Sequence, residues 1–396
     1  MIHRTRALQS IRYAGNAVKA ELASELRIDD RNRILKTRIT HRVFCVNLCL
    51  LAVLLAFCLA PCLASCSISI NENQPEVTAE PPTATRLPSE TSLPSITATS
   101  SITPTIDVPA TVQVLNVLYE QSNLDLQAES ALLMDAQTGQ VFLEKNARQR
   151  MFPASTTKIM TALLALEYLD MEETLMVGEE VNQAWTKLRI NAQKAGLEYG
   201  QEISVKDLLH GMLLMSGSDA AFVLAYQTAQ RESGGMYMDV NQAITHFSEL
   251  MNAMAQELGA FDTHFVNPDG FQDPEHYSTA YDLAMIARAA MQNRDFRSIV
   301  ETPTYLSAEL EFVNGTYPLR WDTTNRLLDV NDMHYYAPAN GIKTGTTEEA
   351  GYCLVSSAVF DERLVIAVVL NSGVENVWTD SISLLEYARQ NLLPGS

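Results

Sequence analysis

The chain has 396 residues, and its formal net charge at pH 7 is −19. A chain of this length can hold two or three domains. Such acidity excludes nucleic acid as a partner and disfavours an anionic membrane surface, because like charges repel. The charge is segregated, since residues 1–42 carry ten Lys and Arg against four Asp and Glu; this surplus of +6 leaves −25 for the rest of the chain.

The start of the chain predicts export. We assign no fold to the basic N-terminal extension 1–42, which suggests a start codon placed too far upstream. Residues 43–63 are almost wholly apolar and follow Arg42, as in a signal sequence. The run ends in "LASC", which resembles a bacterial lipobox and implies lipidation of Cys66 within the predicted signal segment 43–66. An uncleaved signal-anchor helix is the alternative, because the run exceeds the 7–15 residues of a usual signal core.

Either reading anchors the protein to the outer face of the cytoplasmic membrane, in a bacterial cell envelope. Residues 67–111 are a predicted linker, in which Ser, Thr and Pro make up 23 of 45 residues, with no aromatic residue and no Gly. This composition cannot bury enough apolar surface to fold. At ~3.1 Å per residue, the linker reaches ~140 Å at most, enough to hold a domain away from a lipid surface.

The cysteines predict no cross-link. Five of the six lie at or before Cys66, so Cys353 has no partner in the mature part of the chain. Cys353 lies in an apolar, strand-like run and is predicted to be a core residue, and no disulfide framework or cysteine metal site is implied. No other ligand cluster suits a metal, and no cofactor is expected.

Residues 112–396 carry the patterns of one folded domain. The segment 130–146 alternates as a strand, turns at 137–139 and resumes, which predicts a hairpin. Residues 350–360 and 363–372 are predicted to be adjacent antiparallel strands. Helices are predicted over 156–169, 205–215, 220–229, 240–258, 279–291 and 378–393. The fold class is therefore α+β, with an antiparallel sheet built from N- and C-terminal strands, helices packed on it and a helical lobe.

The segment "FPASTTKIM" places a serine and a lysine three residues apart at the start of a predicted helix. Backbone N–H groups at a helix start favour a developing oxyanion near Ser155. A three-residue step brings Lys158 over the same face, where a partly desolvated amine can lose its proton and remove that of the serine. Alone, this spacing is also typical of a capping serine with a snorkelling lysine.

Two later segments strengthen the catalytic interpretation. "LLMSGSDAA" places Ser216 and Ser218 in a break between two helical patterns, and "NGIKTGTT" lies at the start of a strand run. The order Ser-x-x-Lys, Ser-Gly-Ser, Lys-Thr-Gly matches the layout of penicillin-binding proteins and class A β-lactamases. The polar and glycine residues of the second and third motifs are Ser216, Ser218, Lys343, Thr344, Gly345 and Thr346.

From Ala128 to Leu393 the sequence resembles the serine-type D-alanyl-D-alanine carboxypeptidases, which are low-molecular-mass penicillin-binding proteins of the β-lactamase/transpeptidase-like superfamily. The resemblance extends beyond the three motifs to "SALLMDAQTGQVF", "ISVKDLLHGMLLMSGSDAA", "FVNPDGFQDPEHYSTAYDLA" and "NGIKTGTTEEAGYCLVSSA". It implies that Ser155 is the acylated nucleophile, that Lys158 is its general base, and that Ser216 relays a proton to the leaving D-alanine.

The resemblance also implies substrate contacts. Lys343 would lower the pKa of Lys158 and attract the terminal carboxylate of the substrate, which Thr344 and Thr346 would bind through hydrogen bonds. The backbone N–H groups of Ser155 and Thr346 would form the oxyanion hole. Ser218 stands where many relatives have Asn, so looser positioning and slower turnover are expected.

The predicted function is hydrolysis of the terminal D-Ala-D-Ala bond of peptidoglycan stem peptides through an acyl-enzyme, with β-lactams as inhibitors. A D,D-endopeptidase and a β-lactamase-type hydrolase are alternatives; a class A β-lactamase needs a loop Glu in a Glu-x-x-x-Asn pattern, and none is convincing here. A decayed, wall-binding lipoprotein is the third reading, suggested by Ser218 alone. His276 is predicted to be structural and 269–270 to form a turn.

Overall fold

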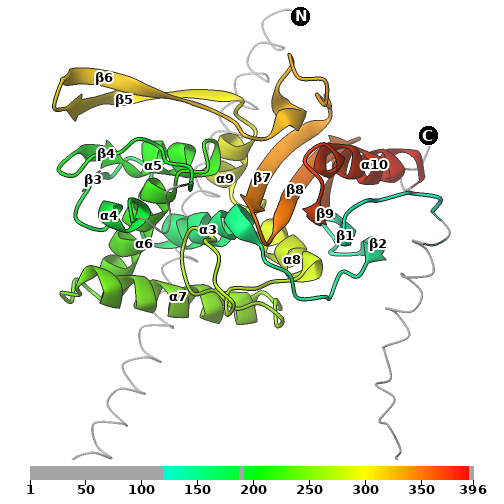
Figure 1. The fold of residues 1–396 in the computed structure, drawn as a ribbon, viewed down its shortest axis with the longest axis horizontal. Coiled ribbons are helices and arrows are strands. Elements are labelled where there is room, and N and C mark those ends of the chain that lie inside the picture. Colours follow the sequence, from blue (N-terminus) through cyan, green and yellow to red (C-terminus); the bar gives the residue numbers. More distant parts are fainter. Residues whose placement is uncertain (1–119, 121, 187–190, 392–396) are drawn as a thin grey trace, which may run out of the picture. The chain divides into compact units, whose positions relative to one another are not determined.

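The described part of the chain comprises residues 120, 122–186 and 191–391 of a computed structural model, and it combines a five-stranded main sheet with a helical lobe (Figure 1). The predicted extension, the signal segment with Cys66 and the whole linker lie outside these residues. None of the described helices has the length and hydropathy needed to cross a bilayer.

The main sheet has five strands in the order β2-β1-β9-β8-β7, and every neighbouring pair is antiparallel. The strands are β1 (Ser130–Asp135), β2 (Val141–Lys145), β7 (Ala339–Thr347), β8 (Gly351–Phe360) and β9 (Arg363–Ser372). The predicted N-terminal hairpin and the pairing of the last two strands are confirmed. β7 forms an edge of this sheet, so one side of the strand is open to a ligand.

Local chemistry explains the first hairpin. The Asp135 carboxylate accepts hydrogen bonds from the backbone N–H groups of Gln137 and Thr138 at 2.9 and 2.8 Å. Gly139 takes a φ of +76°, which glycine adopts without steric cost. The turn therefore closes where the sequence predicts it.

Helices cover both faces of the sheet. Leu354 and Ala367 lie in the apolar cluster beneath α10 (Asn376–Asn391), whereas Val355 and Ile366 lie in the cluster that faces the helical lobe and α8 (Ala280–Ala290). Successive side chains of a strand point to opposite faces. This explains why the near-continuous apolar runs of β8 and β9 are buried on both sides, and each such side chain contributes about 1.5–3 kcal/mol.

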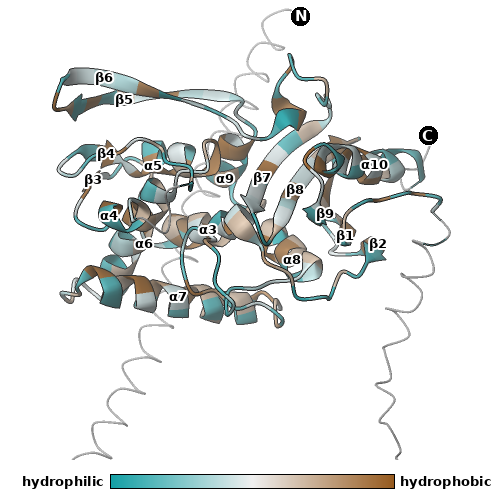
Figure 2. Cartoon of the chain, viewed as in Figure 1, coloured by the Kyte–Doolittle hydropathy of each residue, from teal (hydrophilic) through white to brown (hydrophobic). Residues whose placement is uncertain are grey.

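The helical lobe contains α3 and α4 through α7, with α9 beside it (Figure 1). Figure 2 shows hydrophilic and hydrophobic residues alternating along α7, whose buried Ala243, Phe247, Met251 and Ala255 recur every four residues. The bounds are α3 (Lys158–Tyr168), α4 (Val181–Ala184), α5 (Val205–Leu213), α6 (Ser218–Glu232), α7 (Val240–Glu257) and α9 (Arg294–Val300).

Two helix predictions need correction at the N-terminal end. The helix predicted from residue 156 starts as a 3-10 turn, η2 (Ala154–Thr157), and becomes α-helical at Lys158. Ser218 is the first residue of α6 and does not lie in the break between helices, because the preceding Gly217 ends the non-helical segment. Both deviations occur at motif residues, where the backbone departs from a regular helix.

Two smaller, two-stranded sheets were not predicted. β3 (Thr174–Met176) pairs with β4 (Glu202–Ser204), and β5 (Thr304–Phe312) pairs with β6 (Gly315–Asp322). The β5–β6 hairpin extends over the helical lobe (Figure 1). Its base is fixed there because the Tyr305 ring stacks on His210 at 3.6 Å and its hydroxyl donates to Asp207.

Candidate active site

The serine and lysine of the first motif are in direct contact. Ser155 lies on the η2 turn, Lys158 begins α3, and the lysine Nζ donates a hydrogen bond to the serine Oγ at 2.9 Å. The Lys158 side chain is fully buried. A neutral amine at this distance can instead accept the hydroxyl proton, which is the geometry that general-base activation of a serine needs.

The loop between α7 and α8 completes this contact. The carbonyl oxygen of Asp269 accepts a hydrogen bond from Lys158 Nζ at 2.7 Å and lies 3.4 Å from Ser155 Oγ. Gly270 has a φ of +78°, and a Cβ there would lie 1.8 Å from the Ala154 carbonyl oxygen. Only glycine lets the loop approach the η2 turn so closely.

His276 fixes the same loop. Its Nδ1 accepts a hydrogen bond from the Val266 N–H at 3.2 Å, so Nε2 carries the proton that is donated to Thr157 Oγ1 at 2.8 Å. Burial lowers the pKa of His276 to about 4, against the opposing charges of Asp269 and Asp273. The ring is neutral at physiological pH, and its contacts are those of a structural histidine.

The second lysine is also buried. Lys343 lies on β7, is 1% exposed, and donates a hydrogen bond to the Thr344 carbonyl at 3.0 Å. Burial, and next the positive charge of Lys158, hold the pKa of the Lys343 amine well below its usual value. The two amines therefore interact, and the buried pair resists carrying two positive charges at once.

β7 lies directly against the η2 turn, which carries Ser155. A Cβ on Gly345 would stand 3.0 Å from the backbone nitrogen atoms of Ser155 and Thr156, so this strand position tolerates little beyond glycine. Thr344 Oγ1 forms a hydrogen bond with Thr324 Oγ1 at 2.6 Å, and Thr346 is exposed. The close approach brings the backbone of β7 beside the N–H of Ser155.

The second motif occupies a strained turn. Ser216 has a φ of +64°, and a Cβ on Gly217 would lie 2.8 Å from the Ala195 backbone nitrogen. The Asp219 carboxylate accepts hydrogen bonds from the N–H groups of Ala195, Gly196 and Leu197 at 2.7, 2.9 and 3.1 Å. Asp219 thus ties the segment that follows Asn191 to the serine turn.

These elements enclose a cleft of about 520 Å³. Six of the eight predicted catalytic and substrate-binding residues line it, whereas Lys158 and Lys343 are buried behind it. Cys66 lies outside the described residues. Within the described ranges, no group of three or more His, Cys, Asp or Glu side chains could hold a metal ion. The six lining residues are Ser155, Ser216, Ser218, Thr344, Gly345 and Thr346.

The sequence profile of the Peptidase S11 family, described as D-alanyl-D-alanine carboxypeptidase, matches residues 117–373. This range contains all three motifs and both buried lysines. The chain belongs to the D-alanyl-D-alanine carboxypeptidase family.

Known relatives agree with this family assignment. The chain is 35% identical over 253 residues to the D-alanyl-D-alanine carboxypeptidase DacF of Bacillus subtilis, a match that covers 64% of this chain and 59% of the relative. It is 34% identical over 269 residues to a D-alanyl-D-alanine carboxypeptidase of Streptomyces sp. K15, covering 66% and 87%. The chain thus spans less than two thirds of the length of its Bacillus relative.

The fold of this carboxypeptidase family member resembles a solved structure. The crystal structure of the Streptomyces K15 DD-transpeptidase has 32% sequence identity and a TM-score of 0.61, over 67% of this chain and 98% of that one. The predicted α+β architecture is confirmed by this likeness.

Sequence reasoning missed three supports of the site in this carboxypeptidase family member. These are the carbonyl of Asp269, the ring of His276 as a brace for its loop, and the carboxylate of Asp219. The "NPDG" segment signalled a turn, but a turn pattern does not reveal which carbonyl meets a distant amine. The Asp directly after Ser-Gly-Ser was the available signal for the third support.

Proposed function

We propose that this protein is a D,D-carboxypeptidase that hydrolyses the terminal D-Ala-D-Ala bond of peptidoglycan stem peptides and that penicillin acylates it. The observation that carries the proposal is the 2.9 Å contact between Lys158 Nζ and Ser155 Oγ, beside a second buried lysine. Family membership supplies the reaction class, and the contact supplies the chemistry for it.

Acylation would begin with proton transfer. Neutral Lys158 takes the hydroxyl proton as Ser155 Oγ attacks the carbonyl of the penultimate D-alanine. The N–H groups of Ser155 and Thr346 would then bind the oxyanion, since β7 lies against the η2 turn. Ser216 would pass a proton to the leaving amine, D-alanine would depart, and water would later release the acyl group from Ser155.

Substrate binding would use the edge strand. Lys343 would contribute electrostatic attraction for the terminal carboxylate, and the hydroxyl groups of Thr344 and Thr346 would bind it through hydrogen bonds. Ser218, buried at the start of α6 and lining the cleft, would contact the stem peptide with a single hydroxyl.

The decayed-site reading is disfavoured by the preserved geometry. A site without catalytic selection has no reason to keep two fully buried lysines, because burying an amine is costly. No feature of the cleft favours a β-lactamase over a carboxypeptidase.

The proposal extends to location. The family acts on the cell wall, which lies outside the cytoplasmic membrane. We propose that the signal segment 43–66 exports the chain, that lipidated Cys66 or an uncleaved helix anchors it, and that the linker 67–111 carries the catalytic domain 112–396 toward the wall.

The test is release of D-alanine from a diacetylated tripeptide that ends in Lys-D-Ala-D-Ala. The full chain should release D-alanine, penicillin should stop the release, and Ser155→Ala should abolish it. An active Ser155→Ala variant, or a wild-type chain that binds penicillin but releases no D-alanine, would contradict the proposal.

A further inference from the structure

The cleft has an end wall made by α10. Val377 and Trp378, from the first turn of this helix, line the same cleft as Ser155. Trp378 is 7% exposed and Val377 is 1% exposed, so both are packed in place. Neither residue belongs to the three motifs.

Strand pairing shows which part of the substrate would meet this wall. Thr344 pairs with Leu354 and Thr346 with Tyr352, and directly paired residues of antiparallel strands share a face. Leu354 lies in the apolar cluster that contains Trp378. The two threonine side chains therefore lie on the α10 face of the sheet.

The reacting serine lies toward the opposite face. Gly345 pairs with Cys353, which belongs to the apolar cluster of the helical lobe, and Gly345 is the residue that touches the η2 turn. A substrate whose carbonyl is at Ser155 and whose terminal carboxylate is at Thr344 and Thr346 would therefore extend its last residue toward the α10 face of the sheet, where Trp378 lines the cleft.

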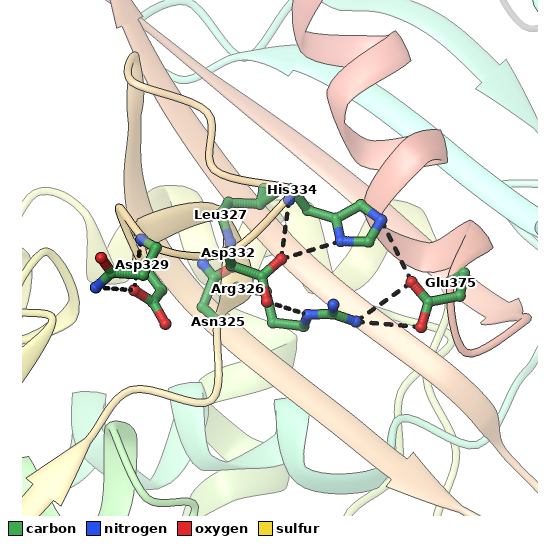
Figure 3. Close-up of polar contacts among 8 residues, drawn as sticks. Asn325, Arg326, Leu327, Asp329, Asp332, His334 and Glu375 are labelled. Carbon is green, nitrogen blue, oxygen red and sulfur yellow. Dashed lines mark hydrogen bonds and ion pairs between the residues drawn. The ribbon is translucent and has the colours of Figure 1, made fainter.

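A cluster of charged side chains packs against Trp378 and holds it in place. The Arg326 guanidinium pairs with Asp332 at 2.7 Å and with Glu375 at 3.3 Å (Figure 3). The same guanidinium lies over the Trp378 ring, 5.7 Å from its centroid. His334 lies between the same two carboxylates, at 3.1 and 3.4 Å, and its ring is 6.3 Å from that of Trp378.

This cluster joins two chain segments. Arg326 lies in η4 (Arg326–Leu328), in the segment that leads into β7, while Glu375 directly precedes α10. Asn325 of the same segment donates a hydrogen bond to the Gly341 carbonyl on β7 at 3.0 Å. The cluster therefore fixes the position of Trp378 relative to the strand that would bind the substrate.

We propose that Val377 and Trp378 determine specificity, by limiting the leaving residue to one as small as D-alanine. In a crosslinked stem, the amine that leaves belongs to a diamino acid whose branch continues into a second stem peptide, and the wall obstructs that branch. The protein is then an exopeptidase that trims free stems and does not open crosslinks. This inference rests on the proposed function.

The test compares two substrates on the full chain. One is a single stem pentapeptide, from which D-alanine release is measured, and the other is a D,D-crosslinked stem dimer, whose conversion to monomers is measured. Rates are normalised to the sites titrated by labelled penicillin. The variants are Trp378→Ala and Val377→Ala, and the control is Phe261→Ala, an exposed aromatic residue that does not line the cleft.

Wild type should release D-alanine at least tenfold faster than it cleaves the dimer. Trp378→Ala should raise the ratio of dimer cleavage to D-alanine release at least tenfold, Val377→Ala should raise it less, and Phe261→Ala should leave it unchanged. If Trp378→Ala fails to bind penicillin, the ratio of dimer cleavage to D-alanine release in Val377→Ala tests the inference instead.

Unchanged ratios in penicillin-binding wall variants would overturn the inference, as would a wild-type chain that cleaves both substrates equally fast. A wild-type chain that forms the penicillin adduct but releases no D-alanine refutes the proposed function instead, and with it the inference that rests on it. The two failures are distinct, because the first leaves D-alanine release intact.

Discussion

The amine of Lys158 is held by the carbonyl oxygen of Asp269 at 2.7 Å, across 111 residues of sequence. A neutral amine has two N–H donors and one lone pair. If one N–H donates to this carbonyl, the orientation of the amine is restrained and its lone pair can face Ser155 Oγ at 2.9 Å. The position of the Lys158 amine relative to Ser155 therefore depends on a loop as well as on the helix.

Removal of the amine should block acylation. Lys158→Gln lacks a general base, which typically contributes 10²–10⁴-fold, so the rate of acylation by labelled penicillin should fall by about that factor. Stopped-flow or quench kinetics measures this rate, with Lys206→Gln, a lysine that does not line the cleft, as control. A fall of less than tenfold in Lys158→Gln would show that another group is the base.

The position of the loop that contains Asp269 and Gly270 should affect the rate of acylation, as the motif residues do. Gly270→Ala and Gly259→Ala share nearly the same backbone strain, since their φ values are +78° and +79°, but a Cβ at 259 meets nothing within 4 Å. The positive φ should cost each variant about 1–2 kcal/mol of stability, and the clash with Ala154 should make the loss larger in Gly270→Ala. Only Gly270→Ala should also slow acylation, by about 10²-fold, because its Cβ pushes the Asp269 carbonyl away. Equal acylation rates in the two variants would refute this role of the loop.

We expect the buried Lys343 side chain to destabilise the folded chain and yet to increase the activity of the enzyme. Its folded pKa is well below that of an unfolded lysine, about 10.4. Between those two pKa values the unfolded chain binds a proton that the folded chain does not, so stability falls as pH decreases through this window. Lys343→Met should therefore raise Tm at pH 7, by an amount that shrinks toward pH 10, and should lower activity about 10²-fold. A Tm of Lys343→Met below that of wild type at pH 7 would contradict the expectation that the buried amine destabilises the folded chain.

His276 should make the fold acid-sensitive. Its pKa is about 4 in the folded chain and about 6.5 when unfolded, so stability is complete above pH 6.5 and is lost as pH falls toward 4. The loss is about 3 kcal/mol at 1.36 kcal/mol per pKa unit. Denaturant unfolding at several pH values should show a shallower acid slope for His276→Gln than for wild type. Phe261→Ala, a control at an exposed residue without a titratable group, should keep the wild-type slope.

The sequence predicted the elements with strong periodicity. The hairpin that turns at Gly139 and the pair β8–β9 appear where their patterns indicate, because alternation and turn residues act locally. The short β3–β4 pair and the β5–β6 hairpin were missed. β5 carries charged and apolar residues without clear alternation, and its place depends on contacts such as that of Tyr305 with Asp207.

The motif residues were identifiable from sequence, but their supports were not. Ser155 and Lys158 are three residues apart, so a helical turn alone brings them together. Lys343 approaches them only because the sheet places β7 beside the η2 turn, where Gly345 permits contact. Trp378 was predicted only as the start of a C-terminal helix, since no local pattern shows that this residue lines a cleft.

The most direct test of the account is to locate the penicillin adduct on the full chain by intact mass spectrometry and peptide mapping. One adduct per chain should map to Ser155, should be lost in Ser155→Ala and should persist in Ser216→Ala. An adduct that maps to Ser216, or that survives in Ser155→Ala, would contradict the assignment of the nucleophile and the mechanism built on it.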